Sequence, residues 1–151
     1  YVEDKKFQTA PFPRSLEFLD YLCQAVPENL HYILQDWFEN ITFYDARILD
    51  AACHREETGR YRIKISFNIK KVRADGMGKE TEVPLHDLIP LGLYSQEGEQ
   101  LYYEKHWIHS GAGTIEITLD RNPAEAVLDP HFLLIDKNAG DNRFRLAKSG
   151  S

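Results

Sequence analysis

The chain has 151 residues, of which 24 are acidic and 18 are basic, and its formal net charge at pH 7 is -6. A chain of this length is one ordinary domain that buries roughly 70% of its unfolded surface, so it needs neither a disulfide framework nor a metal in order to fold. The acidic balance argues against nucleic acid as a main partner, and no apolar run approaches the ~20 residues that a transmembrane helix requires.

The start of the chain differs in pattern from everything that follows. Residues 1–14 are polar, contain Pro11 and Pro13 and show no periodicity, which predicts an extended lead-in. The chain begins YVEDKKF, and its only methionine is Met77. We therefore expect a fragment of a longer polypeptide or a processed product.

Residues 15–42 have the spacing of two helices. Ser15 is a suitable N-cap, and apolar residues recur at helical spacing as far as Pro27, which fits the first turn of a second helix. This second helix, Glu28 to Glu39, has an apolar stripe that is too broad for a helix surrounded by water. The residues of the stripe that we expect to dock against another surface are Leu30, Ile33, Leu34, Trp37 and Phe38.

Residues 43–151 have the pattern of β-strands joined by short turns. In the clearest strand, 60–74, apolar and polar residues alternate strictly, so one face of the strand is expected to be buried. The alternation inverts at Lys71 and Val72, which predicts a β-bulge. Further strands are predicted at 43–56, 79–83, 101–109 and 114–120, with short ones at 126–128 and 132–135.

Prolines and glycines punctuate this pattern. Pro84 and Pro90 flank LHDLI, which predicts a sheet edge or a crossing between sheets before LGLY resumes a strand. The glycines that we expect in hairpin turns are Gly76, Gly78, Gly111 and Gly113. Short strands without helices between them predict a mainly β fold, an antiparallel β-sandwich of about seven strands preceded by two α-helices.

The sequence lacks the motifs of common hydrolases and nucleotide-binding proteins. HExxH, GxSxG and the phosphate-binding loop are absent. His106 and His109 are three residues apart on a predicted strand, so their rings should point to opposite faces and cannot share a metal. Cys23 and Cys53 lie in apolar contexts typical of structural thiols, and whether they pair stays open. We expect no catalysis by this chain alone.

The segment IDKNAGDNRF has the most ligand-like spacing in the chain. It loosely resembles a calcium loop but lacks the terminal glutamate, and aspartate and asparagine also favour turns for local reasons. A structural turn and a cation site are therefore both open. The oxygen ligands of such a site would come from Asp136, Asn138, Asp141 and Asn142.

Aromatic residues leave a second function open. Trp37, Phe38, Tyr44 and Trp107 either pack in the core or form a platform on which sugars stack. The alternative function is therefore an autonomous binding module for carbohydrate or peptide, calcium-dependent if the loop described above binds the ion.

Several sequence runs, taken in order, resemble a known family. These runs are SLEFLDYLCQAVPENLHYILQDWFENITFYDARI, VRADGMGKETEVPLHDLIPLGLY, EQLYYEKHWIHSG, TIEITLDRNPAEAVLDP and LIDKNAGDN. Together they resemble the C-terminal part of bacterial membrane-fused zinc aminopeptidases, in which an aminopeptidase N-like (gluzincin) metallopeptidase is joined to an ABC-type permease. The resemblance covers nearly everything after the lead-in.

The resemblance implies a non-catalytic accessory domain, with two helices (15–42) of the peptidase's helical region and an immunoglobulin- or transthyretin-like β-sandwich (43–151). The parent would use zinc to cleave N-terminal residues from peptides. Its HExxH and GxMEN motifs have no counterpart here, so no catalytic residue or cofactor is carried over. The implied partner is the upstream peptidase or helical domain of the same membrane-tethered polypeptide. The accessory domain would stabilise this partner or shape access to it.

Overall fold

The structure, a computed structural model, describes residues 1–6 and 12–146. The chain divides into Tyr1–Ile41, which we call the helical unit, and Thr42–Ser151, which we call the β unit. Residues 7–11 of the predicted lead-in, and 147–151 at the end of the predicted sandwich domain, lie outside the described residues.

The helical unit begins with α1 (Val2–Lys5), so the prediction of an extended lead-in is wrong at these residues. The next element, α2 (Ser15–Ala25), lies where the first helix is predicted and is followed by Val26, whose backbone is extended. The His31 ring follows this end, with Nε2 at 2.9 Å from the Val26 carbonyl oxygen and 3.0 Å from that of Cys23. The imidazole therefore binds carbonyl groups that the end of a helix leaves without partners.

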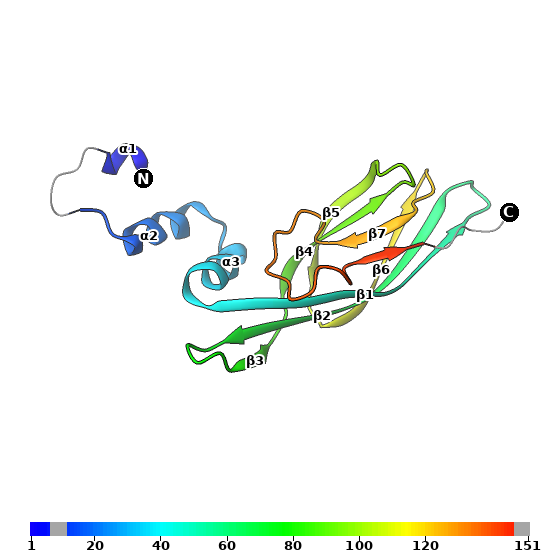
Figure 1. The fold of residues 1–151 in the computed structure, drawn as a ribbon. Coiled ribbons are helices and arrows are strands. Elements are labelled where there is room, and N and C mark those ends of the chain that lie inside the picture. Colours follow the sequence, from blue (N-terminus) through cyan, green and yellow to red (C-terminus); the bar gives the residue numbers. More distant parts are fainter. Residues whose placement is uncertain (7–11, 147–151) are drawn as a thin grey trace. The chain divides into compact units, whose positions relative to one another are not determined.

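The predicted second helix is a succession of three short helical forms. A 3-10 turn, η1 (Glu28–Leu30), precedes one α-helical turn, α3 (His31–Leu34), and a π-helical turn, η2 (Gln35–Glu39) (Figure 1). The π form closes with a 2.9 Å hydrogen bond from the Asn40 N–H to the Gln35 carbonyl, five residues earlier. Its wider turn changes which residues of the apolar stripe face the solvent.

The described part of the β unit contains eight strands in two antiparallel sheets, which confirms the mainly β fold and the β-sandwich (Figure 1). The strands of the first sheet are β1 (Ile41–Arg55), β2 (Tyr61–Ala74), β3 (Glu80–Val83) and β6 (Ala112–Leu119). The strands of the second sheet are β5 (Gln100–Ile108), β4 (Asp87–Tyr94), β7 (Glu125–Leu128) and β8 (Arg143–Arg145), in this order. The last of these, β8, is not predicted from the sequence.

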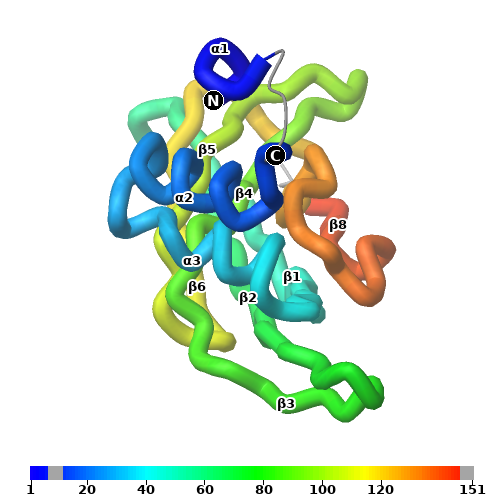
Figure 2. Tube along the Cα trace, turned by 90° about the vertical axis from the view of Figure 1, so that its left-hand side faces the viewer, coloured from blue at the N-terminus to red at the C-terminus, as the bar shows by residue number. Residues whose placement is uncertain are grey.

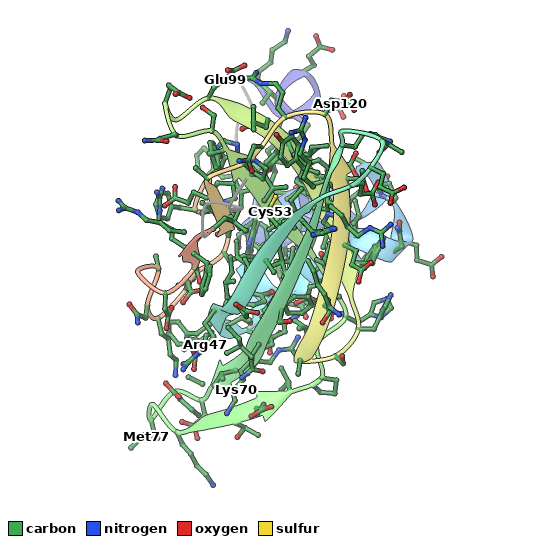
Figure 3. All side chains as sticks on the ribbon, turned by 90° about the vertical axis from the view of Figure 1, so that its right-hand side faces the viewer. Arg47, Cys53, Lys70, Met77, Glu99 and Asp120 are labelled. Atoms are coloured by element: carbon green, nitrogen blue, oxygen red, sulfur yellow. The ribbon has the colours of Figure 1, made fainter. Side chains whose placement is uncertain are left out.

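The central strand of the first sheet is β2. It pairs with β1 along one edge, and along the other edge with β6 over Tyr61–Asn68 and with β3 over Lys71–Ala74 (Figure 3). The ladder to β3 runs from Lys71 to Ala74 without a register shift, so β2 has no bulge at Lys71 and Val72 against β3. Lys71 instead keeps the buried, core-facing phase that Ile69 has two residues earlier.

The crossing between the sheets lies between Val83 and Asp87. As a whole β4 is not an edge strand, because β5 and β7 flank it, but over Asp87–Pro90 it pairs with β5 alone, so the predicted edge holds for this stretch. Pro90 fits inside β4 because the ladder to β7 begins only at Leu91, so no partner strand faces the missing N–H. The Pro90 carbonyl accepts a hydrogen bond of 2.8 Å from the Asp129 N–H.

Two further local predictions are wrong. The segment Phe132–Ile135 is not a strand, and its nearest sheet contact is a single parallel bridge between Asp136 and β1. The turn that contains Gly111 is not a hairpin, because the chain passes there from β5 in the second sheet to β6 in the first. Gly113 lies within β6, opposite Phe67 of β2.

The core of the β unit lies between its two sheets. Its large, fully buried side chains are Ile63, Ile65 and Ile69 of β2, Ile89, Leu91 and Leu93 of β4, and Leu128 of β7. The hairpin of β2 and β3, green in Figure 2, projects beyond these layers, and Met77 lies exposed at its tip (Figure 3). Every member of the core cluster belongs to the β unit, which therefore has an interior of its own.

Candidate functional site

The helical unit carries the five residues predicted to dock. Leu34 is buried and Leu30 and Ile33 are half-buried, whereas Trp37 is 65% and Phe38 is 52% exposed. Both exposed aromatic residues lie in the π-helical turn η2. The part of the predicted set that a partner can reach fully is therefore Trp37 and Phe38.

The helical unit has a small interior and an apolar exterior. Among its described residues, Leu34 and Asp36 are buried. The Phe18 ring contacts Phe38 edge-on, with centroids 6.5 Å apart, and contacts Tyr1 at 5.2 Å. Further large apolar side chains that stay exposed are Val2, Phe12, Leu16, Phe18 and Ile41. The unit thus presents more apolar surface than its own packing covers.

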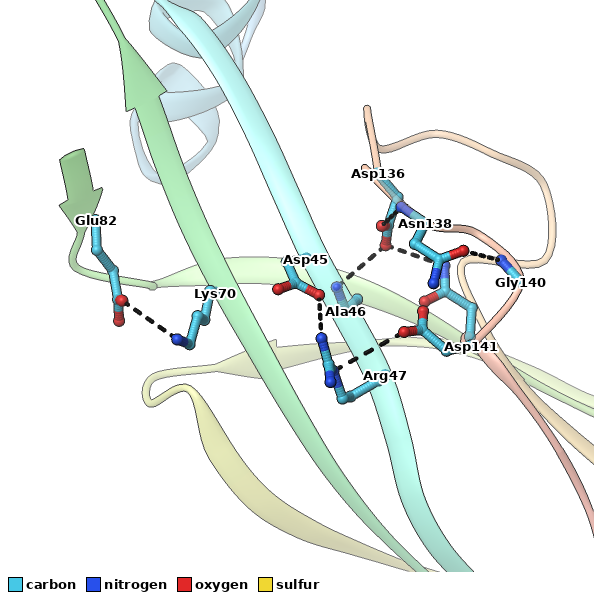
Figure 4. A network of polar contacts seen from close by, with 10 residues as sticks. Asp45, Ala46, Arg47, Lys70, Glu82, Asp136, Asn138, Gly140 and Asp141 are labelled. Atoms are coloured by element: carbon cyan, nitrogen blue, oxygen red, sulfur yellow. Dashed lines mark hydrogen bonds and ion pairs between the residues drawn. The ribbon is translucent and has the colours of Figure 1, made fainter. Parts of the chain in front are cut away.

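The predicted cation loop is held by its own hydrogen bonds (Figure 4). Asp136 accepts from the Asn138 N–H at 2.8 Å with Oδ1, and from the Ala46 N–H at 3.2 Å and Asn142 Nδ2 at 3.1 Å with Oδ2. The Gly140 N–H lies 3.3 Å from Asn138 Oδ1. Bonds of this kind, from an Asp or Asn side chain to the backbone two residues on, shape turns without any ion.

A positive charge lies beside the same loop. Arg47 Nε lies 3.9 Å from Asp141 Oδ2, and Arg47 Nη2 donates to Asp45 at 2.8 Å (Figure 4). The hydrogen bond to Asp45, followed by the charges of Asp45 and Asp141, raises the pKa of Arg47. The Oδ1 atoms of Asp141 and Asn142 are buried and have no partner among the described residues. The structure thus brings the four predicted residues together in a turn that already satisfies Asp136.

One titratable cluster that sequence reasoning missed lies on the inner side of β5. The Tyr102 hydroxyl donates to Glu104 at 3.1 Å and lies 2.9 Å from His106 Nε2, so the imidazole must donate its Nε2 proton to the hydroxyl oxygen. Burial, together with the bond to Glu104, raises the pKa of Tyr102 to about 12. Burial also lowers the pKa of His106, because the imidazolium is poorly solvated there.

A second histidine cluster lies at the other face of the same strand. His109 Nδ1 and His86 Nδ1 are 2.6 Å apart, and the Trp107 ring lies 5.1 Å from that of His86. His106 and His109 thus have different partners on different faces. The pair follows from the strand register in the structure, because Asp87 is opposite Ile108 and the next residues outward are His86 and His109.

The sandwich interior contains an ion pair that the sequence does not reveal. Lys71 Nζ lies 2.9 and 3.1 Å from the two carboxylate oxygens of Asp87, and the Tyr44 hydroxyl donates to Asp87 at 2.8 Å. The Lys71 and Asp87 side chains are 4% and 3% exposed. The cluster joins strands β1 and β2 of the first sheet to β4 of the second, so its position is that of a structural tie between the layers.

A cleft of about 400 Å³ lies beside the start of β5 and the end of β6. Its two arginines are both paired: Arg121 binds both carboxylate oxygens of Glu99 at 2.7 Å, and Arg60 binds Asp120 at 2.8 Å. The hydrogen bonds from Arg121 lower the pKa of Glu99. Because each guanidinium already has a carboxylate, the cleft offers no strong attraction for an anion.

The loop that replaces the predicted strand at 132–135 exposes apolar side chains. Phe132, Leu133 and Ile135 are exposed, while the buried Asp129 carboxylate accepts from the N–H groups of Leu133 and Leu134 at 2.9 and 2.8 Å. Asp129 and Phe132 have positive φ angles of 46° and 54°. Such conformations are costly for residues other than glycine, and the Asp129 bonds compensate for them.

The two cysteines are free thiols. Cys53 Sγ donates to Asn122 at 3.4 Å, and burial raises the pKa of this thiol, which disfavours the nucleophilic thiolate. Across the described residues, no three histidine, cysteine, aspartate or glutamate side chains converge to hold a metal. Within the same part of the chain, the helices lack the combined length and apolar character that crossing a bilayer demands.

Comparison with protein-family models, with curated proteins and with solved structures finds no match to this chain. The resemblance to zinc aminopeptidases therefore rests on the collinear sequence runs alone.

Proposed function

We propose that this chain is a non-catalytic accessory module that docks onto a neighbouring protein through its helical unit. The observation that carries the proposal is the pair Trp37 and Phe38, which project from the helical unit with most or half of their surface exposed. Large aromatic side chains exposed at this level are costly in water and are the usual anchors of protein interfaces.

The local backbone supports this use of the aromatic pair. A π-helical turn is rare, and such turns are frequent at functional sites because they re-aim side chains out of the regular helical phase. Here the turn spans Gln35–Glu39. Besides its exposed apolar residues, Phe12 and Leu16 of the same unit are also exposed. The unit thus offers a partner an apolar surface with aromatic anchors.

The resemblance supplies the partner. In this proposal the neighbour is the catalytic or helical region of a membrane-tethered zinc aminopeptidase, which would hold the zinc and cleave N-terminal residues from peptides. The module stabilises that peptidase or shapes access to it, and its two antiparallel sheets form an immunoglobulin- or transthyretin-like sandwich. The upstream residues of the same polypeptide are the expected docking surface.

The test compares aromatic and matched aliphatic variants in the full-length polypeptide. Trp37→Ser combined with Phe38→Ser should lower the melting temperature of the peptidase and change its rate on aminoacyl reporter substrates. Leu49→Ser, at an exposed apolar position of β1, should do neither. Equal behaviour of the two variants would refute docking through the helical unit. Chelator-sensitive hydrolysis of the reporter by the isolated chain would refute the non-catalytic assignment.

A second candidate function, an autonomous binding module for carbohydrate or peptide, has one observation of its own. Trp107 lies with His86 and His109 on one face of the second sheet, and Tyr103 contacts His131 with ring centroids 4.8 Å apart. Aromatic faces of this kind suit sugar stacking. Saturable binding on a glycan or peptide array that disappears with Trp107→Ala, and survives Trp37→Ser with Phe38→Ser, would favour this function over docking.

A further inference from the structure

Two histidines from neighbouring strand ends meet at one corner of the second sheet. The ladder of β4 and β5 ends with Asp87 opposite Ile108, so His86 and His109 are the next cross-strand neighbours and their side chains lie on the same face. Their Nδ1 atoms are 2.6 Å apart and their ring centroids are 4.3 Å apart. We propose that His86 and His109 form a two-histidine site for a divalent transition-metal ion of the Cu²⁺ class.

The hydrogen bond between the two rings can be replaced by a bound metal ion. In the hydrogen bond between them one Nδ1 carries a proton and the other supplies a lone pair. A metal needs both Nδ1 lone pairs, so the donor ring must move its proton to Nε2 before both rings can bind the ion. Both rings are exposed, so the proton moves through solvent and the ion can enter directly.

The separation of the two nitrogens selects the class of metal. Two nitrogens bound to zinc at 2.0–2.1 Å with a tetrahedral angle are roughly 3.3 Å apart, whereas at the right angle of a tetragonal ion they are roughly 2.9 Å apart. Because the two Nδ1 atoms are 2.6 Å apart, the rings must move apart less to bind a tetragonal ion than to bind a tetrahedral one. Cu²⁺ also stands at the top of the affinity order for nitrogen ligands, and water fills the positions that the protein leaves open.

Trp107 provides a reporter for this site. Its ring is stacked with that of His109, with centroids 6.3 Å apart and an angle of 7° between the planes. Bound Cu²⁺ quenches the fluorescence of a neighbouring indole. The chain has two tryptophans, and Trp37→Phe leaves Trp107 as the single source of the signal.

The experiment titrates the Trp37→Phe chain with Cu²⁺ near neutral pH, following fluorescence and the electron paramagnetic resonance spectrum. We expect saturable quenching and a tetragonal spectrum with nitrogen splitting. His86→Gln and His109→Gln should each abolish the saturable component, whereas His54→Gln and His131→Gln should leave it unchanged. Circular dichroism confirms that the variants stay folded, which is expected because both sites are exposed.

Three outcomes would overturn the proposal. One is quenching that persists in both His86→Gln and His109→Gln, which would place the copper elsewhere. Another is a spectrum without nitrogen ligands, which would mean adventitious copper only. The third is tighter binding of Zn²⁺ than of Cu²⁺, which would show a tetrahedral site. None of these results depends on docking by the helical unit, so the two proposals fail separately.

Discussion

Lys71 and Asp87 place two opposite charges inside the sandwich, with the Tyr44 hydroxyl as a third partner. Removing one partner leaves an uncompensated buried charge, which costs about 3–5 kcal/mol. We therefore expect Lys71→Met or Asp87→Leu alone to lower the free energy of unfolding by that amount, measured by urea denaturation. The double variant should recover most of the loss, because no charge is then left in the core.

A pair on the same strand serves as the control for this prediction. Lys64 lies on the solvent face of β2, 3.8 Å from Glu116, and both side chains are more than half exposed. Because exposed pairs contribute little, Lys64→Met should change stability by about 1 kcal/mol or less. If Lys71→Met were as mild as Lys64→Met, the buried pair would not be a structural tie.

The burial of His106 makes the free energy of unfolding depend on pH, and the direction of this dependence follows from its pKa shift. Burial lowers its folded pKa below the value near 6.5 of an unfolded chain, while Glu104 partly opposes this. The unfolded state therefore binds more protons, so stability is greatest above pH ~6.5 and falls as the pH drops toward the folded pKa. His106→Gln should lose less melting temperature between about pH 7.5 and about pH 5 than the parent chain. An equal or larger loss in the variant would contradict this.

The buried ion pair and the histidine pair could not be predicted from the sequence. Lys71 breaks the alternation of β2, and a pattern alone cannot distinguish a bulge from a charge that is buried because Asp87 neutralises it across the core. The pair of His86 and His109 likewise depends on the register of β4 and β5, which alternation does not determine. Alternation assigns faces, whereas the chemistry depends on which strands become neighbours.

Gly113 is a position in a strand where an added side-chain atom would crowd the core. It lies in β6 opposite Phe67, and a Cβ built there lies 2.6 Å from Phe67 Cζ, in the core. Gly113→Ala should therefore destabilise the β unit by about 1–3 kcal/mol, the usual cost of overpacking. A Cβ at Gly76 meets nothing within 4 Å, so Gly76→Ala should change stability by less than about 0.5 kcal/mol. Urea denaturation of both variants would decide, and equal effects would contradict the packing argument.

Elements with a strict period were predicted closely, and elements shaped by local side-chain bonds were not. The strand predicted at 60–74 is Tyr61–Ala74, because alternation over so many residues has no competing interpretation. The apolar run at 132–135 also reads as a strand, but the Asp129 carboxylate takes the N–H groups that a ladder would use. The helix predicted over Glu28 to Glu39 has the right residues, but hydrophobic spacing does not reveal 3-10 or π hydrogen bonding.

At the scale of the whole chain, burial is distributed unequally between the two units. The core cluster, from Tyr44 to Leu146, belongs entirely to the β unit. The helical unit has an 11-residue helix, α2, without a buried residue, and exposed aromatic side chains in η2. Isolated helices shorter than about 12–15 residues are marginal in water, so the helical unit depends on packing for its order.

This difference predicts how the units behave when they are separated. The fragment 42–151 should keep its β-type circular dichroism and a cooperative urea transition, because every residue of its core is present. The fragment 1–41 should show little helix alone, and helix should increase when a surface that accepts Trp37 and Phe38 is added. A fragment 1–41 that is fully helical and monomeric by itself would contradict the argument, because its apolar surface would then need no partner. Helix that forms with the partner but disappears with Trp37→Ser would link folding of this unit directly to docking.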